Sequence, residues 1–258
     1  MIDKNDNRIL NKPKKRIKEI LGYEIELKLN YFGKFGEVSF SDIKHIFADS
    51  NFALVDELDD LSWIFNFDYY GYWKSNNLIR LFVLIYHPST NKFWLRRKED
   101  YSSPIAVYTG KLAHIARKEE TIIFQKIYNE KAGLEIIKKE EKRLGYKIVF
   151  VGSIVRQKRY FMVEKKDTTR TYSVALDRCR SRGRTLNQLE IEYKWIREKS
   201  RQYTKGVENI INKDLKEIQK MLLNSKIGGK FVPTYLTKWE WLLSLRNKFN
   251  NNGKYEKN

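Results

Sequence analysis

Carboxylates and lysines alternate with apolar residues in two short stretches that lie far apart in the chain. The first covers residues 23–29 and the second covers residues 189–195, and both have the order acid, acid, base at every second position. Residues two apart in a β-strand share one face, so each stretch predicts a strand with one charged and one apolar face. The charged residues are Glu24, Glu26 and Lys28, followed by Glu190, Glu192 and Lys194.

Four glutamates that converge in space would repel one another, and a bound divalent cation is the usual reason that such a cluster is tolerated. Carboxylate oxygens suit Mg²⁺ or Mn²⁺. No thiolate or imidazole set competes, because Cys179 is the single cysteine and the histidines at 45, 87 and 114 lie far apart. One such stretch is typical of a half-buried strand, whereas two in the same phase favour a metal site.

Basic residues at strand spacing form a second set of candidate functional residues. A triphosphate carries about four negative charges in a small volume, and clustered cations are needed to hold it against water. One such pair is usually solvent-facing, but several pairs on successive strands favour an anion site. The candidates are Lys28, Arg96, Lys98, Arg117, Arg156, Lys158 and Lys194.

Asp177 is a further candidate metal ligand, because it shares a strand face with Ser173 and Ala175 and so is expected to point inward beside the second glutamate strand. The alternative is an aspartate at the end of a hairpin that hydrogen-bonds to nearby backbone. Both interpretations stay open at this point.

The composition favours a polyanionic partner. The 258 residues include 51 Lys+Arg against 32 Asp+Glu, a formal charge of +19. This charge attracts nucleic acid, nucleotides, polyphosphate or an anionic membrane surface, although a lysine-rich solvated surface explains it equally well. The single cysteine excludes an internal disulfide framework and fits a reducing compartment. The strongest apolar run, residues 81–86, is too short to span a membrane, and no signal peptide pattern is visible, so we expect a cytoplasmic protein.

Period-2 and period-3.6 patterns predict an α+β protein with many strands and few helices. We expect helices over 121–144, over about 203–224 and around 239–243, with Ser41 capping another helix and Gly145 ending the first. No linker divides the chain, so residues 1–258 form one expected domain, with a basic arm at 1–20 and a disordered tail at 250–258. The expected strands cover residues 22–30, 61–70, 79–86, 93–98, 105–108, 112–118, 147–152, 154–163, 171–179 and 186–195, with a hairpin turn at 181–184.

The E-x-E-x-K stretch near the start and the second E-x-E late in the chain resemble the CYTH family of triphosphate tunnel metalloenzymes. The resemblance covers roughly residues 22–245 and departs most in residues 50–92, whose matching positions stay open. Further segments similar to the family are Leu95-Arg96-Arg97-Lys98, Arg117-Lys118-Glu119-Glu120, Arg156-Gln157-Lys158, Ala175-Leu176-Asp177-Arg178 and Pro233-Thr234-Tyr235.

This resemblance implies a closed antiparallel β-barrel of about eight strands, a tunnel with glutamates binding metal and Arg/Lys binding a triphosphate inside. The apolar strand faces would then be covered by amphipathic helices on the outside. The implied catalytic set is Glu24, Glu26, Glu190 and Glu192, with metal-assisted attack of water on the terminal phosphoryl group and one carboxylate orienting or deprotonating that water.

Several activities occur in this family: hydrolysis of inorganic triphosphate, removal of RNA 5′-triphosphate, hydrolysis of thiamine triphosphate and cyclase chemistry. The residues before the first stretch are Ile20-Leu21-Gly22, not the His-Phe that the cyclase branch often carries. We therefore expect a metal-dependent triphosphatase acting on inorganic triphosphate or a nucleotide. An RNA 5′-triphosphatase is the leading alternative, with nucleic acid contacting the basic arm and the arginines at 178, 180, 182 and 184. A non-catalytic polyphosphate- or nucleic-acid-binding module is the alternative of another class, although a pure anion binder gains nothing from four carboxylates.

Overall fold

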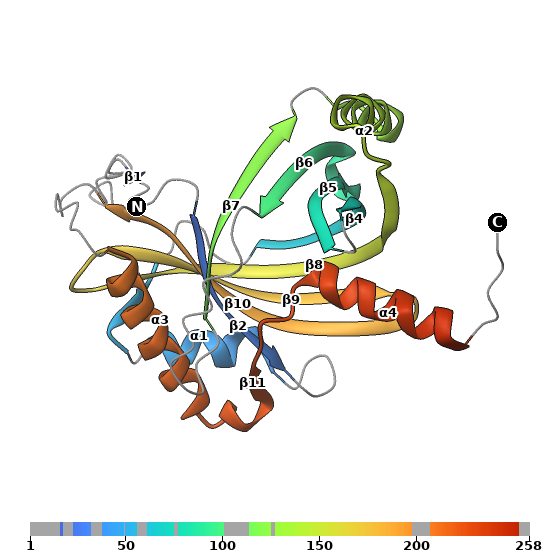
Figure 1. Cartoon of the computed structure of the whole chain (residues 1–258). Helices are drawn as coiled ribbons and strands as arrows, with labels where there is room; N and C mark the ends of the chain where they lie inside the picture. The colour runs from blue at the N-terminus through green and yellow to red at the C-terminus, as the bar shows by residue number, and fades with distance from the viewer. Residues whose placement is uncertain are drawn as a thin grey trace, which may run out of the picture.

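The computed structural model describes residues 16–17, 23–31, 38–48, 50–55, 61–74, 77–100, 114–124, 127–197 and 207–252. These residues form an antiparallel sheet with helices packed against it (Figure 1). The strands are β1 (Arg16–Ile17), β2 (Tyr23–Tyr31), β3 (Phe52–Leu54), β4 (Leu61–Lys74), β5 (Asn77–His87), β6 (Lys92–Asp100), β7 (His114–Phe124), β8 (Val149–Lys165), β9 (Arg170–Ser181), β10 (Arg184–Arg197) and β11 (Phe231–Pro233). The helices are α1 (Phe40–Ala48), α2 (Glu130–Leu144), α3 (Val207–Leu223) and α4 (Lys238–Asn252), with short 3₁₀ turns η2 (Pro88–Thr90) and η3 (Gly228–Lys230).

The strand pairings run in the order β10-β9-β8-β4-β5-β6-β7-β2, and β10 also pairs with β2. Each of these strands therefore has a partner on both sides, and the pairings lead back to their start. The strands nevertheless splay apart into two arms in Figure 1, and β1, β3 and β11 add short edges to β10, β8 and β2. The predicted α+β class and antiparallel sheet are present, whereas a regular closed barrel is seen only in part.

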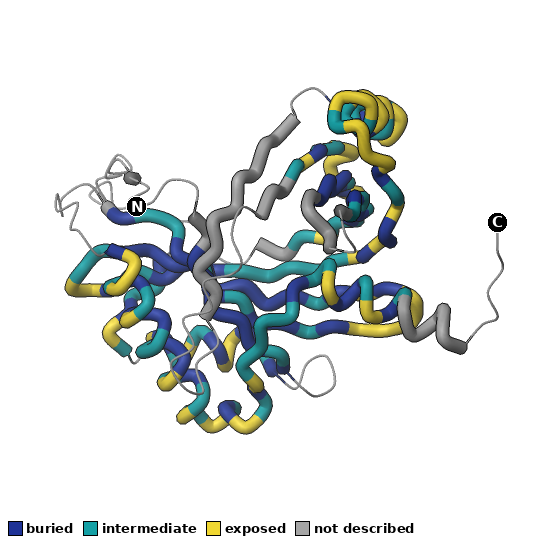
Figure 2. Tube along the Cα trace, in the orientation of Figure 1, coloured by how far each residue is buried: buried dark blue, intermediate teal, exposed yellow. Residues whose placement is uncertain are grey.

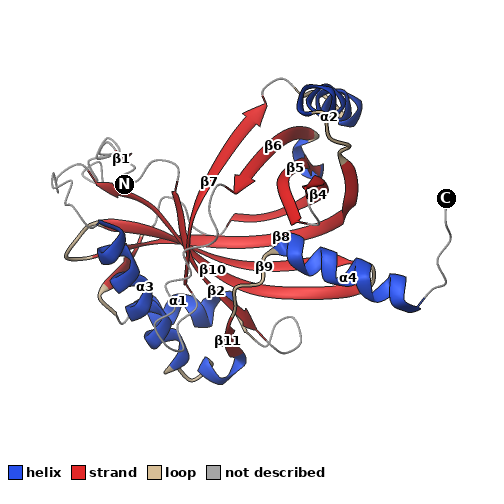
Figure 3. Cartoon of the chain, viewed as in Figure 1, coloured by secondary structure: helices blue, strands red, loops and turns tan. Residues whose placement is uncertain are grey.

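Helices cover the apolar face of the strands, as the alternation predicts. Ile25, Leu27 and Leu29 of β2 are almost fully buried and belong to a core that includes α1 and α3. Burying each such side chain is worth roughly 2 kcal/mol. A second core packs α2 against β5 and β6. Figure 3 shows α1 and α3 together on one side of the sheet, and Figure 2 shows the exposed residues gathered on the outer faces of the helices.

Two helix starts differ from the sequence prediction. Ser39, not Ser41, caps α1, because its Oγ accepts a hydrogen bond from the Asp42 N–H at 3.0 Å while Asp42 Oδ2 accepts from the Ser39 N–H at 3.2 Å. The predicted helix at 121–144 begins only at residue 130. Asn129 caps it by accepting from the Ala132 N–H at 2.9 Å, and residues 121–124 instead extend β7 alongside β6.

The turn between β9 and β10 fixes the register of these two strands. Arg182 and Gly183 both have left-handed backbones, with φ of 47° and 69°. A two-residue turn with positive φ at both residues matches the twist of the flanking strands, so the two strands can pair directly from the turn onward. The predicted hairpin at 181–184 is thereby confirmed, and the register it sets places Asp177 opposite Gln188.

The C-terminal helix α4 packs on the opposite face of the sheet from α1 and α3. Its residues Trp241, Leu242 and Leu245 join a core with Ile154 of β8 and Cys179 of β9. Residues 250–252 belong to α4, so the predicted tail at 250–258 is wrong at its start. Residues 253–258, most of the arm at 1–20 and the predicted strand at 105–108 lie outside the described residues. No helix among the described residues has the length and apolarity needed to cross a membrane.

Candidate functional site

The two charged stretches of the sequence lie side by side in the sheet. The register of β2 and β10 pairs Lys28 with Glu190 and Glu26 with Glu192. Two glutamates directly opposite each other repel unless cations compensate them. Here Lys28 Nζ lies 2.7 Å from Glu26 Oε1, and Lys194 forms an ion pair with Glu192.

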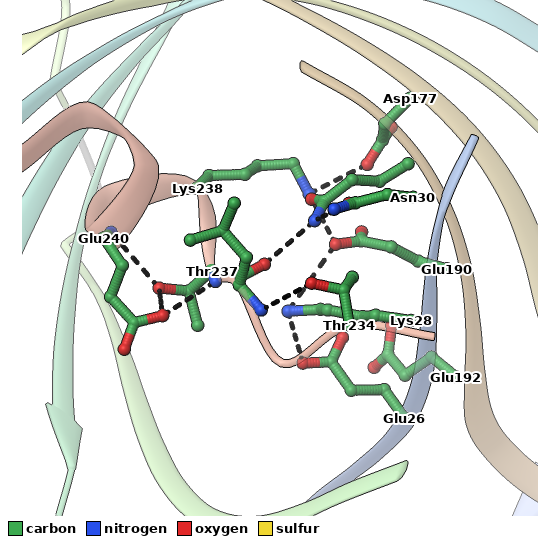
Figure 4. A network of polar contacts seen from close by, with 12 residues as sticks. Glu26, Lys28, Asn30, Asp177, Glu190, Glu192, Thr234, Thr237, Lys238 and Glu240 are labelled. Atoms are coloured by element: carbon green, nitrogen blue, oxygen red, sulfur yellow. Dashed lines mark hydrogen bonds and ion pairs between the residues drawn. The ribbon is translucent and has the colours of Figure 1, made fainter. Parts of the chain in front are cut away.

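A buried ion network continues from this pair to Asp177 of β9 and Lys238 of α4 (Figure 4), and β8 contributes Arg156. Arg156 of β8 donates from Nε to Asp177 Oδ1 at 2.9 Å and lies 3.2 Å from Glu190 Oε2 through its terminal nitrogen. Lys238 Nζ lies 2.5 Å from Glu190 Oε1 and 2.9 Å from Asp177 Oδ2. Asp177 therefore points inward, the first of the two alternatives that its sequence position left open.

The network holds the Glu190 carboxylate ionised despite its burial. Burial by itself would raise the pKa of Glu190, but Lys238, Lys28 and Arg156 hold this pKa well below its ordinary value. The pKa of Lys238 is raised, because Asp177 and Glu190 outweigh both its burial and the repulsion from Arg156. The site therefore presents fixed charges of both signs near neutral pH.

Lys238 reaches the network because a capping box starts α4 immediately before it. The Thr237 N–H donates to Glu240 Oε2 at 2.8 Å, and the Glu240 N–H donates to Thr237 Oγ1 at 3.3 Å (Figure 4). A lysine in the first turn of a helix is unfavourable beside the positive end of the helix dipole. The two carboxylates that Lys238 contacts offset this cost.

A cavity of about 590 Å³ lies beside the network. Its lining combines cations with aromatic rings, and all the Lys and Arg residues of the lining except Lys92 are predicted site residues: Arg96, Arg156, Lys158 and Lys194. Lys158 makes no ion pair with a carboxylate among the described residues. Its burial, and then its closeness to Arg156, lower its pKa to about 8. A lysine in this situation is ready to bind an anion, because a phosphate would restore the charge balance.

Three predicted site residues have positions but no described side chains. Glu24 lies in β2 and is paired in register with Arg117 of β7. Lys98 lies in β6, two residues after Arg96. The structure thus brings Glu26, Lys28, Asp177, Arg156 and the second charged stretch together, while the side-chain roles of Glu24, Lys98 and Arg117 stay predictions.

The donor set for a metal consists of carboxylate oxygens. Among the residues with described side chains, no group of three or more His, Cys, Asp or Glu has the closeness of a metal centre, and Glu24 lies outside that group of residues. Glu190 and Asp177 are each contacted by both Arg156 and Lys238. In the opposed pair, Lys28 contacts Glu26 and Lys194 contacts Glu192.

Sequence reasoning missed two parts of this site. Lys238 gave no signal of its own, although the Thr237-x-x-Glu240 capping box that positions it is visible in the sequence. The aromatic lining is the other part. Trp63, Phe65 and Phe67 alternate on β4 and were expected only as a strand, and His87 was not expected to line a site.

Comparisons with known proteins leave the chain without an assigned family. No protein-family model matches it, and no curated protein matches it. Similar solved structures include a conserved hypothetical protein from Pyrococcus furiosus, with 15% identity, 84% of this chain and 98% of that chain covered, and a TM-score of 0.47. A protein from Pyrococcus horikoshii has 17% identity, with 82% of this chain and 95% of that chain covered, and a TM-score of 0.45.

The Pct1 RNA triphosphatase of S. pombe, solved with the Spt5 CTD, is a further similar structure. It has 12% identity, with 90% of this chain and 84% of that chain covered, and a TM-score of 0.34. At these identities and TM-scores no activity carries over to this chain.

Proposed function

We propose that this protein is a metal-dependent triphosphatase that hydrolyses the terminal phosphoanhydride of inorganic triphosphate or of a nucleotide. One observation carries the proposal. A single cavity is lined by Arg96, Arg156, Lys158 and Lys194, and the carboxylates Asp177 and Glu192 lie in ion-pair contact with two of these cations. Cations that hold phosphate and acids that hold a metal are the two parts that phosphoryl transfer needs.

The ring of strand pairings supports a tunnel around this cavity. Apolar residues of β2, β8, β9 and β10 join the core with α1 and α3, and charged residues at alternate positions of β8 and β10, namely Arg156, Lys158 and Lys194, line the cavity. A polar interior with an apolar exterior under helices is the reverse of an ordinary sheet sandwich. We propose that the whole chain, residues 1–258, forms one domain around this tunnel.

The cations of the cavity bind the triphosphate. Lys158 supplies a charge that no described carboxylate neutralises, and its pKa of about 8 leaves it protonated near neutral pH. Arg156 is held by Asp177 and Glu190, so its guanidinium is fixed in place before the substrate arrives. Fixed donors stabilise charge that develops on the phosphoryl oxygens without reorganising during the reaction.

Glu26 and Glu192 fit a role as ligands of Mg²⁺ or Mn²⁺, with Glu24, Glu190 and Asp177 as further candidates. Their carboxylate oxygens are the donor type that these ions prefer. A bound ion there would neutralise phosphate charge and lower the pKa of a coordinated water. Lys28 and Lys194 balance Glu26 and Glu192 in the structure as it stands. Glu190, kept ionised by three cations, is suited to accept a hydrogen bond from the attacking water and so to orient it.

Phosphate release from a panel of substrates tests the proposal. The purified protein should release phosphate from tripolyphosphate or ATP with Mg²⁺ or Mn²⁺ and not with a chelator present, and thiamine triphosphate completes the panel. Binding of triphosphates without any release would instead support a polyanion-binding module. If the protein neither binds nor hydrolyses any of these triphosphates, the assignment of the cavity is overturned.

A second candidate is an RNA 5′-triphosphatase, and one feature favours it. Arg180, Arg182 and Arg184 are exposed at and beside the tip of the β9–β10 hairpin, on a chain of charge +19. RNA held there would bind with a steep dependence on salt, since each neutralised phosphate releases counterions. Adding 5′-triphosphorylated RNA to the substrate panel at several salt concentrations tests this candidate.

A further inference from the structure

One side of the cavity is a wall of aromatic rings, formed by Trp63 and Phe65 of β4, His87 of β5 and Trp94 of β6. The His87 ring lies 4.8 Å from the Trp63 ring and 4.9 Å from the Phe65 ring, both edge to face. Trp63 and Phe65 are stacked at 6.3 Å with 27° between their planes. All but His87 are only partly buried, so these rings present open surface to the cavity.

The aromatic wall adjoins the cations in the strand register. β4 pairs with β8 so that Trp63 lies opposite Lys158 and Phe65 lies opposite Arg156. On the other side, β5 pairs with β6 so that His87 lies opposite Lys92. A ligand whose phosphates contact Arg156 and Lys158 therefore has flat apolar surface within reach of its remaining part.

His87 is an unusual member of this wall. It is only 3% exposed, and neither ring nitrogen has a hydrogen-bond partner among the described residues. A buried polar group without a partner costs free energy, so each one calls for an explanation, and a bound ligand is one such explanation. Neutral imidazole has one donor and one acceptor, which matches the mixed donor and acceptor edge of a nucleobase.

We propose that the aromatic wall binds the base of a nucleoside 5′-triphosphate, so that the enzyme prefers nucleotide ends to inorganic triphosphate. This inference rests on the proposed triphosphatase function and names its substrate class. The base stacks on Trp63 or Phe65, as bases do on aromatic side chains of proteins that bind single strands, and His87 hydrogen-bonds to its edge. Free nucleotide and the first nucleotide of RNA share this chemistry.

Packing alone does not account for the wall. The buried cores of the protein consist of apolar side chains that touch one another, and Phe67, the next aromatic residue on the same strand face, joins the core with α4. Phe65 packs partly against this core, whereas Trp63 belongs to none of the described cores and stays only partly buried beside the cavity, opposite Lys158. Inorganic triphosphate has no group that would use this surface.

Two variants test the wall in the full-length protein: Trp63→Leu and His87→Leu. We expect kcat/KM for ATP and for 5′-triphosphorylated RNA to fall about tenfold or more, the size of one lost base stack. The kcat/KM for tripolyphosphate should stay within about twofold. Ile64→Ala is the matched control, because Ile64 is the neighbouring residue on β4, is 47% exposed and does not line the cavity. Trp63→Phe keeps a ring and should retain most of the ATP activity.

A binding measurement separates failure of this inference from failure of the proposed function. Equilibrium dialysis should show that ATP binds the wild type more tightly than tripolyphosphate does, and that Trp63→Leu removes the difference. If ATP binding shows this preference but no triphosphate is hydrolysed, the base site is supported and the proposed triphosphatase activity is wrong. If the wild type hydrolyses tripolyphosphate and the variants lose activity equally on all substrates, or on none, the base site at the wall is overturned. If the variants lose activity only on RNA, the base site is assigned to RNA ends. If neither ATP nor RNA binds the wild type, the base site is overturned. Thermal melts show whether each variant is folded.

Discussion

Two lysines of the same strand, β8, illustrate two uses of a buried charge. Lys165 lies outside the cavity, with Nζ 2.8 Å from Asp214 Oδ1 and 2.7 Å from Glu217 Oε2 on α3. Burial lowers the pKa of Lys165, but these partners raise it above its ordinary value overall. Lys158 lies in the cavity beside Arg156, and its pKa is lowered to about 8.

The difference between the two lysines separates a charge that holds the fold from a charge that awaits a ligand. Tyr172 completes the outer network by donating to Asp214 at 2.6 Å, so the groups around Lys165 are mutually satisfied. Around Lys158 the protein has an excess of positive charge, which costs stability unless an anion arrives. Binding sites are often places where a protein tolerates such a cost.

Removing one acid from each network should give the largest contrast. Glu26→Ala or Glu192→Ala should lower kcat by roughly a hundredfold or more, since loss of charge stabilisation in the transition state costs about 3 kcal/mol. Glu217→Ala, in the outer network, should leave kcat near the wild-type value. Phosphate release by the three folded variants measures this. Near-normal release by both inner variants would remove Glu26 and Glu192 from the metal site.

Replacing each lysine by methionine should sharpen the contrast in stability. Lys165→Met leaves Asp214 buried and unpaired, so we expect a loss of about 3–5 kcal/mol and a lower Tm. Lys158→Met should leave Tm unchanged or raise it, because the lysine is protonated in a buried place that disfavours its charge. The same variant should raise KM for triphosphate about tenfold. Thermal melts with kinetics check both, and a destabilised Lys158→Met would contradict the comparison.

The sequence allowed the charged half of the site to be predicted for a physical reason. Period-2 alternation places Glu26 with Lys28 and Glu190 with Glu192 on one face whatever the tertiary structure. The apolar alternates then require covering helices, and α1 and α3 do cover them. The place of each strand in the ring of pairings, however, depends on pairing between segments that lie far apart in the sequence. No local pattern predicts that β2 pairs with β10, as the structure shows.

The missed parts of the site depend on tertiary structure that local patterns do not carry. Residues 121–124 fit the apolar stripe of the following helix, yet pairing with β6 makes them strand. Trp63 and Phe65 alternate as core residues do, and only the cavity distinguishes them from core. Lys238 became part of the site because Thr237 and Glu240 fix the start of α4 beside Asp177.

The pH dependence of the reaction should report on the cavity lysine. Lys158 has a pKa of about 8, below its ordinary value, so it is charged below pH 8 and neutral above it. The kcat/KM for tripolyphosphate, which reflects groups of the free enzyme, should therefore fall several-fold as the pH rises through 8. Lys158→Arg keeps its charge at high pH and should remove this limb. A limb at the same pH in Lys158→Arg would assign it to another group.

The smallest expected effect tests how the helix start positions the network. Thr237→Ala removes the hydroxyl that accepts the Glu240 N–H, and loss of such a cap costs about 1 kcal/mol. The first turn of α4 should then fray and loosen Lys238, which holds Asp177 and Glu190. We expect Tm to fall by a few degrees and kcat to fall about twofold, with KM little changed, because Arg156 and Lys158 still bind the triphosphate. Thr237→Ser keeps the cap and should restore both values.

If Thr237→Ala lowers Tm without changing kcat, the cap holds α4 to the sheet but Lys238 does not depend on it. The inner network would then resemble the outer one around Lys165, with charges fixed by their mutual pairing more than by the helix that carries them.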